Sequence, residues 1–252
     1  MRQCLVGFGL SASVMMFLAG AAGCQKPTPG PVASVATPAA EPTGPNTLSA
    51  SESAEGWKLL FDGQTLTGWH PYNNAGTPVT QWKVEDGTIA WAEKGADLVT
   101  DDDYASFELS LDWKISEGGN SGVFFHVTED HKFPWETGPE MQILDDERHG
   151  DGKNPKTSAG ANYALDPPEG KTLNPVGQWN TAKLVVKGDH VDHWLNGKKV
   201  VSYTLWSDGW KAQVAASKFS GMPDYGLRKT GRIVLQDHGN HVWFRNVKIR
   251  AL

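Results

Sequence analysis

From residue 56 onward, hydrophobic and polar residues alternate along much of the chain with a period of two. The clearest example runs from residue 107 to residue 115, where Phe107, Leu109, Leu111, Trp113 and Ile115 are separated by polar residues. This alternation is typical of β-strands that place one face in a hydrophobic core. Turn sequences such as Glu85-Asp86-Gly87 and Asn196-Gly197 separate further segments of this kind. With no long amphipathic helix, and only a short helical turn near residues 210–216, the pattern predicts an antiparallel β-sandwich.

Three predicted strands carry unusual residues on the face that points away from the core. The apolar residues that would face the core are Val123, Phe125 and Val127, then Met141 and Ile143, then Ile233 and Leu235. The residues that would face outward are Phe124, His126, Glu140, Gln142, Gln236 and His238. A solvated face normally carries Lys, Glu, Thr and Ser, whereas an aromatic ring, histidines, a carboxylate and carboxamides suit a sugar-binding groove. Each residue alone is an ordinary surface residue, and periodicity does not show that the three strands are neighbours.

Two long segments interrupt the alternation, at residues 145–176 and 207–229. Both are rich in Gly, Pro and charged residues, and loops of this length are commonly functional. We expect them to border the groove. Three aromatic residues in or beside them, Tyr163, Trp206 and Tyr225, are candidates for stacking on a sugar.

The N-terminal part of the chain has the composition of a targeting segment followed by a linker. Arg2 precedes an apolar run at residues 5–22 that ends in small residues before Cys24, which predicts a secretory signal. Small residues directly before a cysteine resemble the lipobox of bacterial lipoproteins, although an ordinary signal peptide with a chance cysteine is the alternative. We therefore expect a signal peptide at residues 1–23, lipidation at Cys24, and a disordered Pro/Ala/Thr-rich linker at residues 24–55. The domain at residues 56–252 would then be anchored in the bacterial cell envelope, facing the periplasm or the exterior.

Composition narrows the function classes. The net charge is −6 at pH 7, so the chain has no electrostatic footprint for nucleic acid. Cys4 belongs to the predicted signal, which leaves Cys24 as the only thiol of the mature protein. An intramolecular disulfide and a thiolate metal site are thereby excluded. The eleven tryptophans, all within the domain, suit sugar contacts and core packing equally.

Five segments together resemble the 3-keto-disaccharide hydrolase family. They are "LLFDGQTLTGW" (59–69), "GNSGVFFH" (119–126), "EMQILDD" (140–146), "GQWNTAKLVVKGDHVDHWLNGKKV" (177–200) and "GRIVLQDHGNHVWFRNVKI" (231–249). The resemblance covers nearly all of residues 56–252. It implies a concanavalin A-like jelly-roll sandwich, often secreted or lipid-anchored. It also implies a carbohydrate substrate whose C3 hydroxyl has been oxidised to a ketone, and this substrate comes from the family alone.

The candidate residues suit that chemistry better than ordinary glycoside hydrolysis. Two carboxyl groups normally flank the bond, but Glu140 and Asp145 would point to opposite faces of a regular strand, about 16 Å apart. A 3-keto sugar instead needs one base for its C2 proton, one acid for the leaving oxygen and a partner for the enolate. We expect Glu140 to be the base and His126 or His238 the acid or enolate partner, with Gln142 and Gln236 orienting hydroxyls. His126, Glu140 and His238 are also candidate ligands of a divalent metal, although no spacing motif supports one.

Two other classes of protein compete with the enzyme. The same sandwich serves in non-catalytic carbohydrate-binding modules, and a structural cell-envelope domain is a third interpretation. A binding module needs aromatic platforms and amides but has no use for a glutamate among histidines. We interpret Asp101-Asp102-Asp103 as an acidic turn rather than a calcium site, residues 237–240 as a turn, and His149, His190 and His193 as surface residues.

Overall fold

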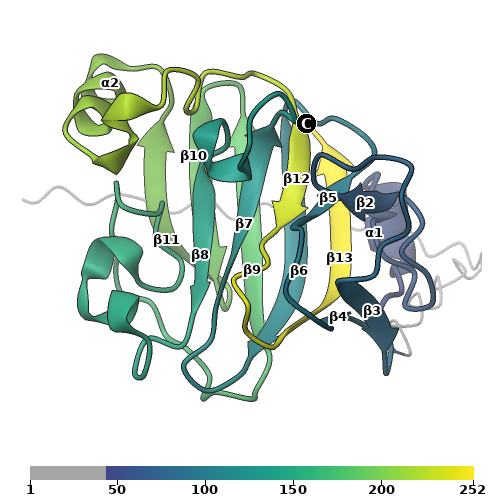
Figure 1. Cartoon of the computed structure of the whole chain (residues 1–252). Helices are drawn as coiled ribbons and strands as arrows, with labels where there is room; N and C mark the ends of the chain where they lie inside the picture. The colour runs from purple at the N-terminus through teal and green to yellow at the C-terminus, as the bar shows by residue number, and fades with distance from the viewer. Residues whose placement is uncertain (1–43) are drawn as a thin grey trace, which may run out of the picture. The chain divides into compact units, whose positions relative to one another are not determined.

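In a computed structural model of the chain, residues 44–252 are described, and they form a sandwich of two antiparallel β-sheets (Figure 1). The larger sheet has the strand order β11-β10-β9-β6-β13-β4-β3, with β1 paired to β13. Its strands are β1 (Lys58–Leu59), β3 (Trp82–Glu85), β4 (Thr88–Trp91), β6 (Phe107–Ile115), β9 (Asn180–Lys187), β10 (His190–Leu195), β11 (Lys198–Thr204) and β13 (Val242–Ala251). The antiparallel sandwich predicted from the alternation is confirmed.

The smaller sheet contains the three strands that carry the unusual outward residues. Its strand order is β2-β5-β12-β7-β8, with bounds β2 (Trp69–Pro71), β5 (Leu98–Thr100), β7 (Asn120–Val127), β8 (Glu140–Leu144) and β12 (Arg232–Leu235). In Figure 1, β12, β7 and β8 lie next to one another, and Val123 of β7 pairs with Met141 on one side and Leu235 on the other. The sheet therefore brings together the faces that periodicity left unconnected.

One hydrophobic core fills the space between the sheets, and alternate residues of each strand supply it. Strand β6 alternates strictly between buried and half-buried residues. Six of the seven residues predicted for the core on β7, β8 and β12 belong to it: Val123, Phe125, Met141, Ile143, Ile233 and Leu235. Strands β7 and β8 are buried along their whole length, because loops cover their outer face as well.

The alternation fails at His126, and the prediction for its orientation is wrong. His126 has a φ of +54°, and the pairing of β12 with β7 shifts register opposite it, between Arg232 and Val234. Such a bulge inserts one residue and reverses the faces that follow. The His126 ring therefore packs on Phe107 and Phe125. Val127, which was predicted to face the core, instead joins an outer cluster with Phe124.

The connections contain short helices. They are α2 (Asp208–Ala215) and the 3₁₀ helices η1 (Pro134–Glu136), η2 (Gly150–Lys153), η3 (Pro155–Thr157) and η4 (Lys218–Gly221). The side chain of Ser207 caps the start of α2 by accepting a bond from the Trp210 amide. The short helical turn predicted near residues 210–216 is confirmed as α2.

Part of the predicted linker has regular structure. Helix α1 (Ala50–Ala54) lies inside the predicted linker and starts with a capping box between Ser49 and Glu52. Asn46 is buried, exchanges hydrogen bonds with Asn246, and donates to the carbonyl of Gly87. The linker prediction is therefore wrong for residues 46–55. The predicted signal peptide, Cys24 and the first part of the linker lie outside the described residues, and within residues 44–252 no helix has the length and apolar character needed to cross a membrane.

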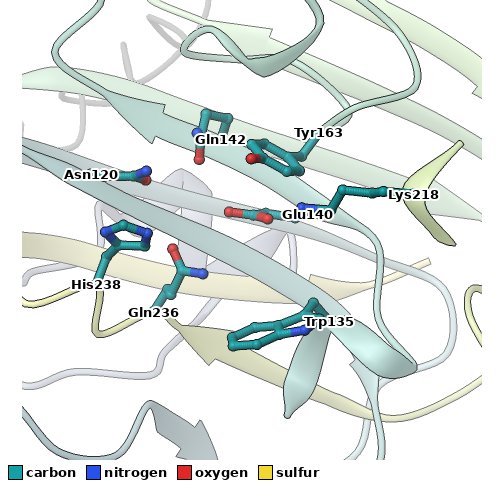
Figure 2. A pocket seen from close by; sticks show the side chains of 8 residues that line it. All are labelled: Asn120, Trp135, Glu140, Gln142, Tyr163, Lys218, Gln236 and His238. Atoms are coloured by element: carbon teal, nitrogen blue, oxygen red, sulfur yellow. The ribbon is translucent and has the colours of Figure 1, made fainter. Parts of the chain in front are cut away.

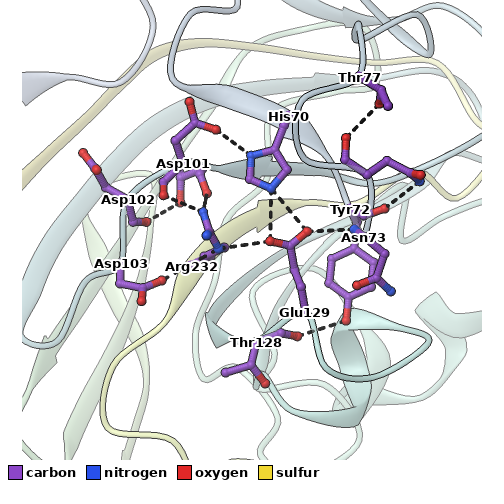
Figure 3. A network of polar contacts seen from close by, with 12 residues as sticks. His70, Tyr72, Asn73, Thr77, Asp101, Asp102, Asp103, Thr128, Glu129 and Arg232 are labelled. Atoms are coloured by element: carbon purple, nitrogen blue, oxygen red, sulfur yellow. Dashed lines mark hydrogen bonds and ion pairs between the residues drawn. The ribbon is translucent and has the colours of Figure 1, made fainter.

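A network of polar contacts around the buried His70 lies at the edge of the smaller sheet (Figure 3). His70 on β2 lies between the Asp101 carboxylate, 2.5 Å from Nδ1, and the Glu129 carboxylate, 3.0 Å from Nε2. Arg232 on β12 contacts the same Glu129 at 3.1 Å and reaches toward Asp103. The acidic turn at residues 101–103 thus has a histidine and an arginine as partners.

Candidate active site

A pocket opens on the outer face of the smaller sheet, where β7, β8 and the end of β12 meet (Figure 2). The residues that line it are Asn120, Trp135, Glu140, Gln142, Tyr163, Lys218, Gln236 and His238. Tyr163 belongs to the loop at residues 145–176 and Lys218 to the loop at residues 207–229. Both long loops therefore border the pocket, as the sequence predicts.

Glu140, the first residue of β8, is the only carboxylate among the residues that line this pocket. Its side chain points into the pocket in Figure 2, and the residue is only 6% exposed. Burial raises the pKa of Glu140 to about 8; Lys218 acts against this rise, and Asp97 and Asp151 add to it. A carboxyl group with such a pKa exchanges protons near neutral pH, as a catalytic acid or base must.

Three carboxamide oxygens in the pocket lack a partner within residues 44–252. They are Asn120 Oδ1, Gln142 Oε1 and Gln236 Oε1, and all three are buried. The amide of Gln142 donates to the Thr157 carbonyl at 3.1 Å, which leaves its oxygen facing the pocket (Figure 2). A buried acceptor without a donor is unfavourable by about 1–3 kcal/mol. Hydroxyl groups of a bound ligand would satisfy these oxygens.

Lys218 brings a positive charge to the pocket. Its Nζ lies 4.2 Å from the centre of the Tyr163 ring, and the Tyr163 hydroxyl donates to Asp151 at 3.1 Å. Burial lowers the pKa of Lys218, while Glu140 and Asp151 act in the opposite direction. Lys218, Asn120 and Trp135 are site residues that the sequence did not reveal, because a single lysine in a loop or asparagine at a strand end carries no pattern.

An acidic pair holds Gln236 and His238 in place. The Asp237 amide between them donates to the Asp97 carboxylate at 2.7 Å. The Asp237 carboxylate accepts bonds from Trp91 Nε1 and from the amides of Gly95 and Gly239. Burial raises the pKa of Asp97 to about 7. Residues 236 and 238 thus face the pocket while residue 237 anchors the turn that was predicted there.

Several predicted site residues lie elsewhere. Phe124 is buried in the outer cluster with Val127 and Val234. Tyr225 is 2% exposed and stacks on Phe219 with ring centres 3.8 Å apart, and Trp206 donates to the Gly226 carbonyl. None of the three lines the pocket: Phe124 is covered on the outer face of β7, and the loops turn Trp206 and Tyr225 toward the hydrophobic core.

His126 is also absent from the pocket, so the predicted metal set is not brought together. Its Nε2 donates to the Ala105 carbonyl at 2.8 Å, and burial lowers its pKa. Across residues 44–252, no three side chains of His, Cys, Asp or Glu are arranged to hold a metal ion. Of the three candidates for acid, base or metal ligand, Glu140 and His238 share the pocket and His126 does not.

Two further predictions concern residues outside the pocket. His193 was expected at the surface but is buried: it donates to the Gly160 carbonyl and contacts the Tyr203 hydroxyl, and burial lowers its pKa to about 4. Asp145 does not pair with Glu140. Its carboxylate accepts bonds from the amides of Gly118, Glu147 and Arg148 and so organises its own loop.

A β-sandwich whose outer face carries a buried carboxyl group, free carboxamide oxygens and aromatic rings defines a carbohydrate-active protein. The chain belongs to the family of 3-keto-α-glucoside-1,2-lyase-like domains, whose model matches residues 56–250. The resemblance seen in the sequence is thereby confirmed.

Individual relatives support the same assignment and show that the chain is an enzyme of the hydrolase type. The chain is 33% identical to the 3-keto-disaccharide hydrolase of Bacteroides thetaiotaomicron, with 82% of each chain covered. A crystal structure of a candidate glycosyl hydrolase from Parabacteroides distasonis is 42% identical, with a TM-score of 0.78 over 83% of this chain and 100% of that one. A second such structure from that organism is 30% identical, with a TM-score of 0.63 over 78% of this chain and 99% of that one.

Proposed function

We propose that this protein cleaves glycosides whose C3 hydroxyl has been oxidised to a ketone. The observation that carries the proposal is Glu140, a single buried carboxyl group whose pKa is raised to about 8 and which shares a pocket with three unpartnered carboxamide oxygens. The oxygens suit the hydroxyl groups of a sugar, and the carboxyl group suits proton transfer at carbon.

The reaction follows from the ketone. Glu140 removes the proton from C2, which the neighbouring ketone acidifies, and an enolate forms. The electron pair then forms the C1–C2 double bond, the C1–O bond breaks, and the leaving oxygen takes up a proton. Water adds across the double bond, with its hydroxyl on C1 and its proton on C2, so the net result is hydrolysis. The name of the family describes a lyase and that of the Bacteroides relative a hydrolase, which correspond to the elimination alone and to the elimination followed by hydration.

The other residues of the pocket supply the remaining roles. His238 is the candidate acid for the leaving oxygen. Lys218 provides the positive charge for the enolate, and Asn120, Gln142 and Gln236 accept bonds from sugar hydroxyls. Paired-carboxylate hydrolysis is less suitable, because Asp145, the other carboxylate considered, is bound within its own loop.

We also propose the features that concern fold detail and location. The sandwich would follow the concanavalin A-like jelly roll, and Cys24 would carry a lipid anchor that holds the domain at the bacterial cell envelope. The family resemblance supports the first proposal and the sequence before Cys24 supports the second. Replacing Cys24 with serine should release the protein from the membrane fraction, and a variant that stays with membranes would contradict the anchor.

The decisive experiment measures sugar release from a 3-keto disaccharide by the wild type and by Glu140→Gln. We expect turnover to fall by about 10²-fold or more, with binding retained, because the amide has the same shape as the acid. Glu147→Gln is the matched control, because Glu147 is exposed. The exchange of the C2 proton with deuterium should vanish in Glu140→Gln. If exchange persists while cleavage stops, Glu140 is the acid; if the wild type binds the sugar without cleaving it, the protein is a binding module.

A further inference from the structure

Gly122 occupies the middle of β7 although its backbone does not require a glycine. Its φ is not in the left-handed region, and it pairs in regular register with Gln142. Its backbone carbonyl accepts a hydrogen bond from the backbone N–H of Gln236 at 2.9 Å. A glycine inside a strand weakens it, because backbone entropy is lost without any side-chain packing in return. The reason for this glycine must therefore lie in its surroundings.

The surroundings are the side chain of Glu140. A Cβ atom at residue 122 would lie 2.8 Å from Glu140 Cδ and 3.0 Å from Cγ, and closer still to Oε1. Glu140 pairs directly with Phe124, so Gly122 is its diagonal neighbour on the same face of the sheet, within reach of a long side chain. The carboxyl group thus occupies the space that any other residue at 122 would fill.

Other closely packed glycines differ in what they contact. A Cβ at Gly231 would lie 2.5 Å from the backbone carbon of His126, and one at Gly138 would lie 2.7 Å from the carbonyl oxygen of Phe125 and closer still to the Val127 side chain, which is not part of the pocket. Gly231 thus allows two backbone segments to approach each other, and Gly138 packs against both the backbone and a side chain of β7. Gly122 alone among these three makes room for a side chain of the pocket.

We propose that Gly122 is the positioning residue of the Glu140 carboxyl group, and that its missing side chain lets this group lie across β7 and point toward the pocket. The inference rests on the proposed role of Glu140. Lying against the strand also removes the carboxyl group from water, and this burial is the cause of its raised pKa. Any side chain at residue 122 would push the carboxyl group away from β7.

The test uses Gly122→Ala, with Gly150→Ala as the control, because a Cβ at Gly150 would meet nothing within 4 Å. We expect Gly122→Ala to lower kcat for a 3-keto disaccharide by about 10²-fold, the effect of a displacement of about 1 Å in an active site, while the control keeps wild-type activity. The rising limb of the pH–rate profile should also move to lower pH, because the displaced carboxyl group is more hydrated.

A second variant separates positioning from a general loss of structure. Glu140→Asp shortens the side chain and leaves room for the methyl group of alanine. The double variant Gly122→Ala/Glu140→Asp should therefore be at least as active as Gly122→Ala alone. As a single substitution, by contrast, Glu140→Asp should lower activity. If Gly122→Ala fails to fold, recovery of folding in the double variant supports the inference, and failure of both contradicts it.

A measurement that needs no substrate keeps the inference distinct from the proposed function. In protein with ¹³C-labelled glutamate, the carboxyl carbon of Glu140 is assigned by its absence in Glu140→Gln, and its titration gives the pKa. We expect the pKa to fall in Gly122→Ala and to stay in Gly150→Ala. If the wild type cleaves no 3-keto sugar but the pKa falls, the positioning holds and the proposed function fails. An unchanged pKa and unchanged turnover in Gly122→Ala overturn the positioning. The positioning is also overturned if the activity lost in the double variant equals the combined losses of the two single variants.

Discussion

Lys218 and Tyr163 join the two long loops across the pocket, with the Lys218 Nζ 4.2 Å from the centre of the Tyr163 ring. An ammonium group over an aromatic face is attracted by the negative charge of the ring surface. The contact holds the ammonium group in the wall of the pocket that contains Glu140 (Figure 2). Each loop alone contributes one residue, and the pair makes a positively charged wall.

Replacing Lys218 with methionine should lower activity and shift its pH dependence. Lys218 favours the ionised form of Glu140 and so acts against the rise of its pKa to about 8. Without Lys218 the pKa of Glu140 should rise further. The rising limb of kcat/KM against pH should therefore move to higher pH, with a loss at pH 7 of about tenfold or more, since fewer Glu140 side chains are ionised. Lys211→Met is the control, because Lys211 lies in the same loop but is exposed. An unchanged limb would remove Lys218 from the site.

Replacing Glu140 with glutamine should stabilise the fold at neutral pH. The pKa of Glu140 is raised from an ordinary 4.5 to about 8, so the folded state holds a proton that the unfolded state releases between these values. The wild type therefore loses stability as pH rises from about 4.5 to 8, by at most about 1.4 kcal/mol per pH unit. Glutamine does not titrate, so the Tm advantage of Glu140→Gln should grow through that window and level off above it. Thermal unfolding at a series of pH values measures this, and a constant difference in Tm would show that the pKa is not raised.

Replacing any of the three carboxamide residues of the pocket, Asn120, Gln142 and Gln236, should weaken substrate binding more than it lowers turnover. Replacing Gln236 with methionine keeps the shape of the side chain and removes its unpartnered oxygen, one of the buried acceptors. We expect KM to rise about 2- to 13-fold, the effect of one hydrogen bond of about 0.5–1.5 kcal/mol, with kcat nearly unchanged. A substrate analogue that lacks the hydroxyl bound by Gln236 should lose affinity for the wild type and not for the variant. Equal losses in both proteins would mean that Gln236 does not contact that hydroxyl.

Tyr163 and Tyr225, which were both predicted to stack on a sugar, should behave differently on replacement by alanine. Tyr163 lines the pocket, so Tyr163→Ala should raise KM with little change in Tm. Tyr225 is buried in a stack with Phe219 and Trp210, so Tyr225→Ala should lower stability by about 3–5 kcal/mol. Steady-state kinetics and thermal unfolding of both variants show whether each ring contributes to substrate binding or to stability. A large drop in Tm for Tyr163→Ala would place that ring in the core instead.

Local periodicity alone determined which residues of β8 and β12 share a face. Because successive side chains on a strand alternate between its faces, Glu140, Gln142 and Gln236 could be assigned to the outer face before any contact was known. The same rule failed at His126, because the bulge that reverses its orientation depends on how β12 pairs with β7. The sequence of one strand does not specify the register in which a neighbouring strand pairs with it.

Only the tertiary structure decided which of the outward residues form a site. The order β12-β7-β8 brings together residues far apart in sequence, and folded loops add Lys218 and Tyr163 while turning Tyr225 inward. Asn46 and helix α1 join the domain through contacts with Asn246 and Lys248, which a Pro-rich composition conceals. The sequence therefore determined the sandwich and the chemistry of its outer face, because both depend on neighbours along the chain. The pocket itself depends on strand pairing and loop packing, whose partners are distant in sequence.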